Sequence, residues 1–485
     1  MPQLMSGSLA AIAVWLAIAP APPVTKAQAP PIRTYQPKAT ENARQLQVLD
    51  QQQKAAAHRF DLAKYPISDR HLTHWQESLW AIGVLTPSQP YVFTALDNVL
   101  RLTTAPNLSD PQKAIVDTAM QVSTQLYTLK PAVYGKLKQN FVNTINLSND
   151  PQWVAISLLA LSKSASYPLE IYPLETNAND PQPADPLVNP KPSQKSNQKL
   201  VQTLIAKVKQ RFPQWSQDPH LRTTIQNLQS TPPANTPNLQ DLLTWQVAPN
   251  QPHLYVFCRP NRDVLCTTVL KDGNGKFVKN AAKQLWSAPL LLQSLHNLDW
   301  NFTNGRTPQG LYRMEGISRQ PDDEVFHAYG QFSLVNLFLP FEDGVNSFLP
   351  SQKGKFTGSL KDYQMLLPPS WRSYAPLQQA YWAGNMGRSL FRIHGSGAAL
   401  DFFGSKPAVV NPQNFDWNPT LGCLSAIELY DQRGNLLKAD MPKILDALNT
   451  VGRGKIEGYL IVVDIPDPTA QDQAIPLTEI AKYID

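Results

Sequence analysis

One cysteine and one histidine in the C-terminal half have the residue types and neighbours that acyl transfer requires. Cys423 follows Gly422, and His394 precedes Gly395 directly after Phe391-Arg392-Ile393, a segment typical of a strand. A thiol attacks a carbonyl carbon well only as its thiolate, and a nearby imidazole can accept the thiol proton. Backbone N–H groups near Gly422 are candidates for stabilising the oxyanion that forms. The pair therefore indicates Cys423 as nucleophile, His394 as base and Gly422 as oxyanion donor.

The alternative is structural, because a lone cysteine is more often a small buried apolar residue than a nucleophile. The cysteine count bears on this choice. The chain has three cysteines, and Cys258 and Cys266 flank the short loop 259–265. In a hairpin symmetric about Arg262 these two residues face each other within disulfide reach. The spacing predicts a Cys258–Cys266 disulfide with Cys423 as the free thiol, and two reduced, half-buried cysteines are the alternative.

The segment that carries these residues has the residue composition of a β-rich domain. Branched and aromatic residues are concentrated in 254–259 and 264–270, and turn-forming residues follow at 271–275. Strand-forming and turn-forming residues recur together at 317–340 and 426–438. The run 455–465 is typical of a last strand that completes the domain. We expect a β-rich domain over 251–465 and a C-terminal tail over 466–485.

The preceding part of the chain has helical patterns. Helix formers without Gly or Pro fill 40–64, and apolar residues recur at helical spacing in 68–85. Start signals precede 111–129 and 152–163. The stretch 172–196 is rich in Pro, Asn, Asp and Ser, which predicts a linker or a long loop. The fold class expected is α+β multidomain, with a mostly helical N-terminal region over 40–247.

The N-terminus has the pattern of an export signal. An apolar run at 9–19 has the length of a signal-peptide core, and Ala27 and Ala29 fit a cleavage site. We expect 1–29 to be a signal peptide or an uncleaved membrane anchor, and either places the rest outside the cytoplasm.

The charge and ligand patterns bear on possible partners. The net charge of +6 suits an anionic surface or polymer, but Lys and Arg are not clustered, which argues against nucleic acid. The histidines His253, His327 and His394 are isolated from cysteine pairs, so no metal-ligand spacing is present.

Three segments in this order resemble the catalytic domain of the L,D-transpeptidase (YkuD-like) family. The segments are Thr307-Pro308-Gln309-Gly310, Ile393-His394-Gly395-Ser396 and Thr420-Leu421-Gly422-Cys423-Leu424. With the flanking β-rich texture, the resemblance covers about 251–465. The chain departs from the family at Leu421, where a second motif histidine usually stands, and at Ser425, where Arg or Asn is usual.

The resemblance implies a peptidoglycan L,D-transpeptidase in the periplasm or cell envelope, acting in cell-wall biogenesis and cell shape. Cys423 would form a thioester with the third residue of a tetrapeptide stem and pass it to an acceptor amine, giving a 3→3 cross-link without a cofactor or metal. Gly395, Ser396, Thr420 and Ser425 would contact the stem peptide. The alternatives are an L,D-carboxypeptidase with water as acceptor and a non-catalytic wall-binding protein, which Leu421 and Ser425 favour.

Overall fold

The computed structural model describes residues 40–163, 194–230, 235–295, 298–319, 330–398 and 411–484. The predicted export segment 1–29 and residues 172–193 of the predicted linker lie outside these ranges. The chain divides into two compact units. Of the described residues, the helical unit takes those in 54–230, and the β-rich unit takes those from 231 onward together with 40–53. The predicted α+β class is consistent with this content of helices and mixed sheet.

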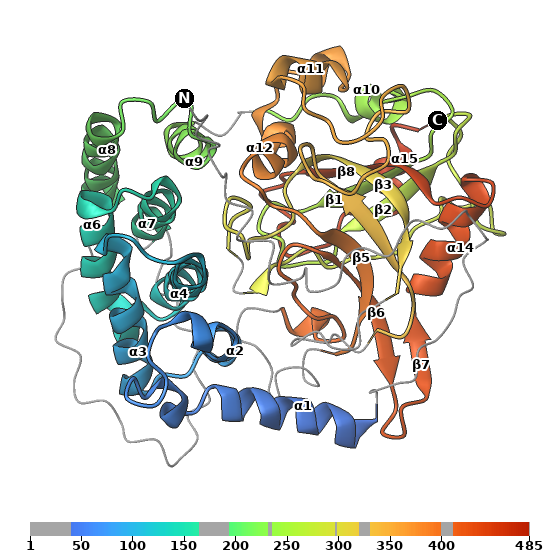
Figure 1. Cartoon of the computed structure of the whole chain (residues 1–485). Coiled ribbons are helices and arrows are strands. Elements are labelled where there is room, and N and C mark those ends of the chain that lie inside the picture. Colours follow the sequence, from blue (N-terminus) through green and yellow to red (C-terminus); the bar gives the residue numbers. More distant parts are fainter. Residues whose placement is uncertain are drawn as a thin grey trace. The chain divides into compact units, whose positions relative to one another are not determined.

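The helical unit is built around one long, almost fully buried helix, α4 (Asp110–Leu129). Its first turn is fixed by a capping box, in which the Ser109 hydroxyl accepts the Gln112 N–H and the Gln112 side chain accepts the Ser109 N–H. Helices α2, α3 and α7 pack against α4 (Figure 1). The main helices around it are α2 (Leu72–Leu85), α3 (Pro90–Leu100), α6 (Lys138–Leu147), α7 (Pro151–Lys163), α8 (Gln194–Arg211) and α9 (Pro219–Gln229).

The β-rich unit contains an eight-stranded sheet with the order β2-β1-β8-β3-β4-β5-β6-β7. Two neighbouring pairs are parallel, β1 with β8 and β5 with β6, and the other pairs are antiparallel. The bounds are β1 (His253–Cys258), β2 (Thr267–Lys271), β3 (Gly310–Ser318), β4 (Leu334–Phe338), β5 (Phe391–Ser396), β6 (Leu424–Tyr430), β7 (Leu436–Ala439) and β8 (Glu457–Asp464).

Apolar clusters cover both faces of the central strands. Along β8, Leu460 and Val462 belong to one cluster, and Tyr459, Ile461 and Val463 belong to the other. The first cluster is completed by α14 (Met441–Val451), and the second by α10 (Leu239–Thr244) and α15 (Leu477–Ala481). Burial on both faces explains why these strands are continuous apolar runs rather than alternating ones.

The unit boundaries differ from the predicted ones at both ends. Leu242 and Leu243 of α10 are buried against the sheet, so this helix belongs to the β-rich unit and not to the helical region predicted to end at 247. The predicted tail 466–485 also packs on the sheet, because Ile475 and Ile480 are buried in the same cluster. Helical periodicity shows that a segment is amphipathic, but it does not show which surface covers its apolar side.

The N-terminal helix α1 (Glu41–Lys54) begins within the β-rich unit, where the Glu41 N–H donates to the Gln432 carbonyl at 3.1 Å. Among the described residues, no helix combines the length and apolar character needed to cross a membrane.

Candidate functional site

Parallel pairing of β5 with β6 brings the histidine and cysteine segments together. The register pairs Ile393 with Leu424 and His394 with Ser425, and Cys423 immediately precedes β6. Positions offset by two residues on adjacent strands have Cα atoms about 7–8 Å apart. His394 and Cys423, predicted as base and nucleophile, therefore lie at neighbouring positions, one within β5 and the other directly before β6 (β5 and β6 in Figure 1).

The loop before Cys423 is tied to the first motif segment by a buried hydrogen bond. The Thr307 hydroxyl donates to the Gly422 carbonyl at 2.7 Å. Within the loop, the Thr420 hydroxyl donates to the Cys423 carbonyl at 2.6 Å and accepts the Gly422 N–H at 3.2 Å. Thr420, predicted to contact substrate, thus shapes the nucleophile's own loop.

Gly422 occupies a position where no other residue fits. Its φ of +124° lies outside the range that L-residues adopt readily. A Cβ there would lie 2.5 Å from Nη2 of Arg388 and 2.8 Å from Cε1 of Phe391. Because its N–H already bonds Thr420, Gly422 must release this bond before it can act as the predicted oxyanion donor.

The hydrogen bonding of His394 defines its basic nitrogen. Nδ1 lies 3.0 Å from the Gly395 carbonyl oxygen. A carbonyl oxygen only accepts, so in the neutral ring Nδ1 carries the proton and Nε2 carries the lone pair. The half-buried imidazole therefore has Nε2 as its proton acceptor.

The three remaining predicted substrate contacts are buried. The side chains of Ser396 and Ser425 are inaccessible to solvent and hydrogen bond to each other. Gly395 lies against the Glu428 carboxyl group, where a Cβ would overlap Oε2. In this arrangement Ser396, Ser425 and Gly395 support the strand pair, and their contact with a stem peptide stays a prediction.

The cysteine pairing agrees with the prediction. Cys258 and Cys266 form a disulfide, and Cys423 is the free cysteine. Its side chain is partly exposed, and Sγ lies 3.6 Å from the Leu390 carbonyl oxygen.

Residues that the sequence did not single out hold Leu390 in place. Leu390 has a φ of +64°, and its N–H donates to Oε1 of Glu342 at 2.8 Å. Burial raises the pKa of Glu342 to about 8. Nη2 of Arg388 occupies the space where a side chain on Gly422 would begin. Neither Glu342 nor Arg388 belongs to a recognisable spacing, so no sequence signal marks them.

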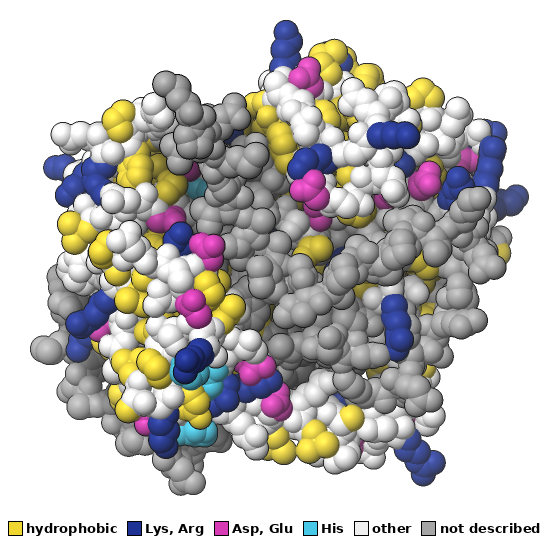
Figure 2. Space-filling view, in the orientation of Figure 1, with side chains coloured by type: hydrophobic (Ala, Val, Ile, Leu, Met, Phe, Trp, Pro, Cys, Tyr) yellow, Lys and Arg dark blue, Asp and Glu magenta, His cyan; other side chains and the backbone are white. Residues whose placement is uncertain are grey.

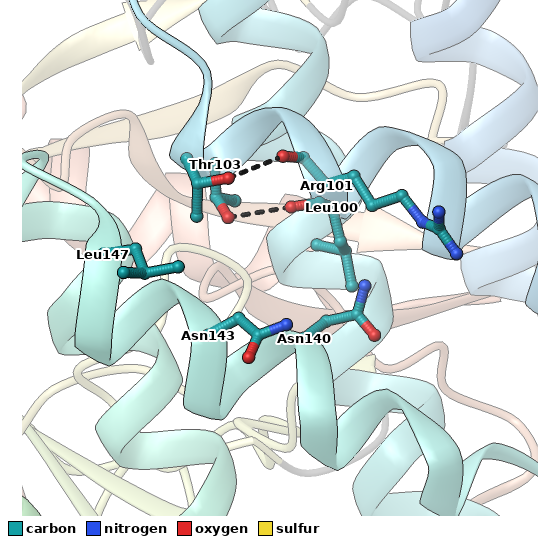
Figure 3. Close-up of a pocket in the computed structure, with 7 residues that line it drawn as sticks. Leu100, Arg101, Thr103, Asn140, Asn143 and Leu147 are labelled. Atoms are coloured by element: carbon teal, nitrogen blue, oxygen red, sulfur yellow. Dashed lines mark hydrogen bonds between the residues drawn. The ribbon is translucent and has the colours of Figure 1, made fainter.

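A small hollow of about 100 Å³ lies in the helical unit, between α3, α6 and the turn after α3 (Figure 3). Several of its polar groups bond to neighbouring atoms: the Thr103 hydroxyl donates to the Leu100 carbonyl, and the Asn140 amide donates to Asp97. These contacts leave it without an evident ligand anchor. Among the described residues, no group of three or more His, Cys, Asp or Glu side chains is placed to hold a metal.

No family model, curated protein or solved structure matches this chain. The resemblance to L,D-transpeptidases therefore depends on the three sequence segments alone.

Proposed function

We propose that the β-rich unit is a cysteine-dependent L,D-transpeptidase that cross-links peptidoglycan stem peptides outside the cytoplasm. The observation that carries this proposal is the Thr307–Gly422 hydrogen bond, which joins two motif segments 115 positions apart at the residue before the free cysteine. Pairing of β5 with β6 adds His394 to the same place. In support of a peptide substrate rather than nucleic acid, Lys and Arg side chains are scattered over the described surface seen in Figure 2.

The proposed reaction has two acyl transfers. His394 Nε2 takes the Cys423 thiol proton, and the thiolate attacks the carbonyl carbon of the third stem residue. The tetrahedral intermediate collapses as His394 protonates the departing D-Ala amine, which leaves a thioester. An acceptor amine then attacks the thioester and gives its proton to His394. Sγ leaves and takes this proton back, and a 3→3 peptide bond has formed.

A non-catalytic wall-binding protein is the second candidate. Leu421 occupies the position of a motif histidine and is 37% exposed, so no second imidazole is available in the loop. The engaged Gly422 N–H also favours this candidate, because a working oxyanion hole needs donors that face the substrate. An L,D-carboxypeptidase would use the same thioester with water as acceptor.

The test is incubation of the purified protein with tetrapeptide-stem muropeptides, followed by mass spectrometry of protein and products. We expect an acyl-enzyme and a cross-linked dimer, both absent from Cys423→Ala. Tripeptide without dimer would identify a carboxypeptidase. Absence of adduct and product, with muropeptide binding retained, would exclude both enzymatic functions.

A further inference from the structure

Arg388 is a buried arginine that contacts the nucleophile's loop. Only 7% of the residue is exposed. Its terminal nitrogens donate to backbone carbonyls alone: Nη1 to Trp300 and to Arg306 at 3.1 Å, and Nη2 to Gly305 at 2.8 Å and to Leu421 at 3.4 Å. With these donors engaged, the guanidinium is fixed in place and is not available to bind a substrate carboxylate.

No carboxylate of the described residues forms an ion pair with this guanidinium. It lies over the Phe391 ring, with Cζ 4.8 Å from the ring centroid. The nearby Tyr312 phenol donates to the Pro308 carbonyl, and burial raises its pKa well above its usual value, so this phenol stays neutral. Burial lowers the pKa of Arg388 only to about 10, so the guanidinium stays charged at neutral pH.

The group placed to balance this charge is the thiol of Cys423. Nη2 lies against Gly422, the residue before Cys423, and donates to the carbonyl of Leu421. The Coulomb interaction between the two groups also favours charged Arg388. Such an interaction is mutual, so the same cation favours the Cys423 thiolate.

We propose that Arg388 is a positioning residue whose fixed positive charge stabilises the Cys423 thiolate. Its part in acyl transfer rests on the proposed function, but its effect on the thiol does not. His394 moves protons, whereas Arg388 holds a constant charge against Gly422, the residue before Cys423, in both steps. In the second step this charge also stabilises the departing thiolate.

The experiment measures alkylation of Cys423 by iodoacetamide as a function of pH, by intact mass, in the full chain with its disulfide intact. Arg388→Met removes the charge and keeps an unbranched side chain. A nearby opposite charge shifts such an equilibrium by about 1–3 pH units, so we expect alkylation at pH 7 to slow at least about tenfold. At high pH the rates of both proteins should converge. Arg388→Lys keeps the charge and should restore most of the rate.

The matched control is Arg306→Met. Arg306 lies in the same loop region but already pairs with Asp299 at 3.0 Å, so its loss removes no unpaired cation. We expect less than about a twofold change in alkylation, because Arg306 and the Asp299 carboxylate left behind are both partly exposed, so solvent screens their charges. Equal slowing in this control would overturn the proposal in favour of a loosened loop.

Three further results would overturn it. One is an Arg388→Met profile equal to that of the unaltered protein. Another is equal slowing in Arg388→Met and Arg388→Lys at every pH, which would indicate a packing role. The third needs no variant: half-maximal alkylation of the unaltered protein at or above about pH 8.5, the value of a free thiol. If alkylation is slowed in Arg388→Met and restored in Arg388→Lys, but no muropeptide products form, the proposed function is refuted and the role of Arg388 is retained.

Discussion

Thr307→Val tests whether the bond between the first motif segment and the cysteine loop organises the site. The substitution removes the hydroxyl and nearly preserves the side-chain shape. Thr307 and Gly422 are both buried, and the Thr307 hydroxyl is the donor found for the Gly422 carbonyl among the described residues. A buried acceptor left without its donor costs about 1–3 kcal/mol. We therefore expect the free energy of unfolding of the β-rich unit to fall by about 2 kcal/mol.

The assay is urea denaturation of the full chain, followed by tryptophan fluorescence. With a slope of about 2 kcal/mol per molar urea, the expected loss lowers the midpoint of the β-rich unit by about 1 M. The helical unit contains neither residue, so its transition serves as an internal reference. Two units also mean that a single two-state fit is not justified. Thr307→Ser keeps the hydroxyl and is the matched control.

The same variant should slow acyl-enzyme formation, because the Gly422 carbonyl immediately precedes the nucleophile and its release lets the loop move. A shift of about 1 Å at a reacting group lowers rates by about a hundredfold. Thr307→Ser should retain most of the rate. The reasoning is refuted if valine and serine variants share one unfolding midpoint and one acylation rate.

Three further predictions concern the surrounding structure. Burial raises the pKa of Glu428 from 4.5 to about 7. The contribution of its protonated carboxyl group to the free energy of unfolding is therefore fully present below pH 4.5 and is lost as pH rises through 7. Stability should fall over this window by an amount on the order of 3 kcal/mol, and Glu428→Gln should flatten the fall in pH-dependent urea titrations. Gly422→Ala should destabilise the β-rich unit by more than about 1–2 kcal/mol, seen as a lower urea midpoint, because a Cβ meets both backbone strain and Arg388. Thiol titration of denatured protein should find one thiol before reduction and three after it, and replacing Cys258 and Cys266 by serine should cost about 2.5 kcal/mol.

Local features of the fold were predictable where the chain carries its own signal. Helix α4 begins after Ser109, where Ser109, Pro111 and the apolar residues that follow predicted a helix start. The disulfide followed from the symmetry of one short hairpin around Arg262, which indeed has a φ of +60°. In each case the relevant contacts lie within a few residues of one another, so spacing is sufficient to predict them.

The burial of Ser396 and Ser425 was not predictable in this way. Their contact depends on the register of β5 against β6, which joins residues 29 positions apart. Arg388 presents the same difficulty. Arginine is mostly exposed in proteins, and here burial arises only because carbonyls of Trp300, Gly305 and Leu421 converge on one guanidinium. These contacts join the loop of Trp300 and Gly305, the loop of Leu421 and the loop of Arg388 itself. The sequence of any one of these loops does not predict the contacts.

The way the chain holds Cys423 argues for a reactive thiol rather than a structural one. The residues on either side, Gly422 and Leu424, are buried, yet the Cys423 side chain is partly exposed. A cysteine that served only to fill the core would have its sulfur buried, as Cys258 and Cys266 do. A nucleophile instead needs a rigid backbone and an accessible sulfur. Thr307 and Thr420 supply the rigidity through their hydroxyls, as the proposed cysteine nucleophile requires.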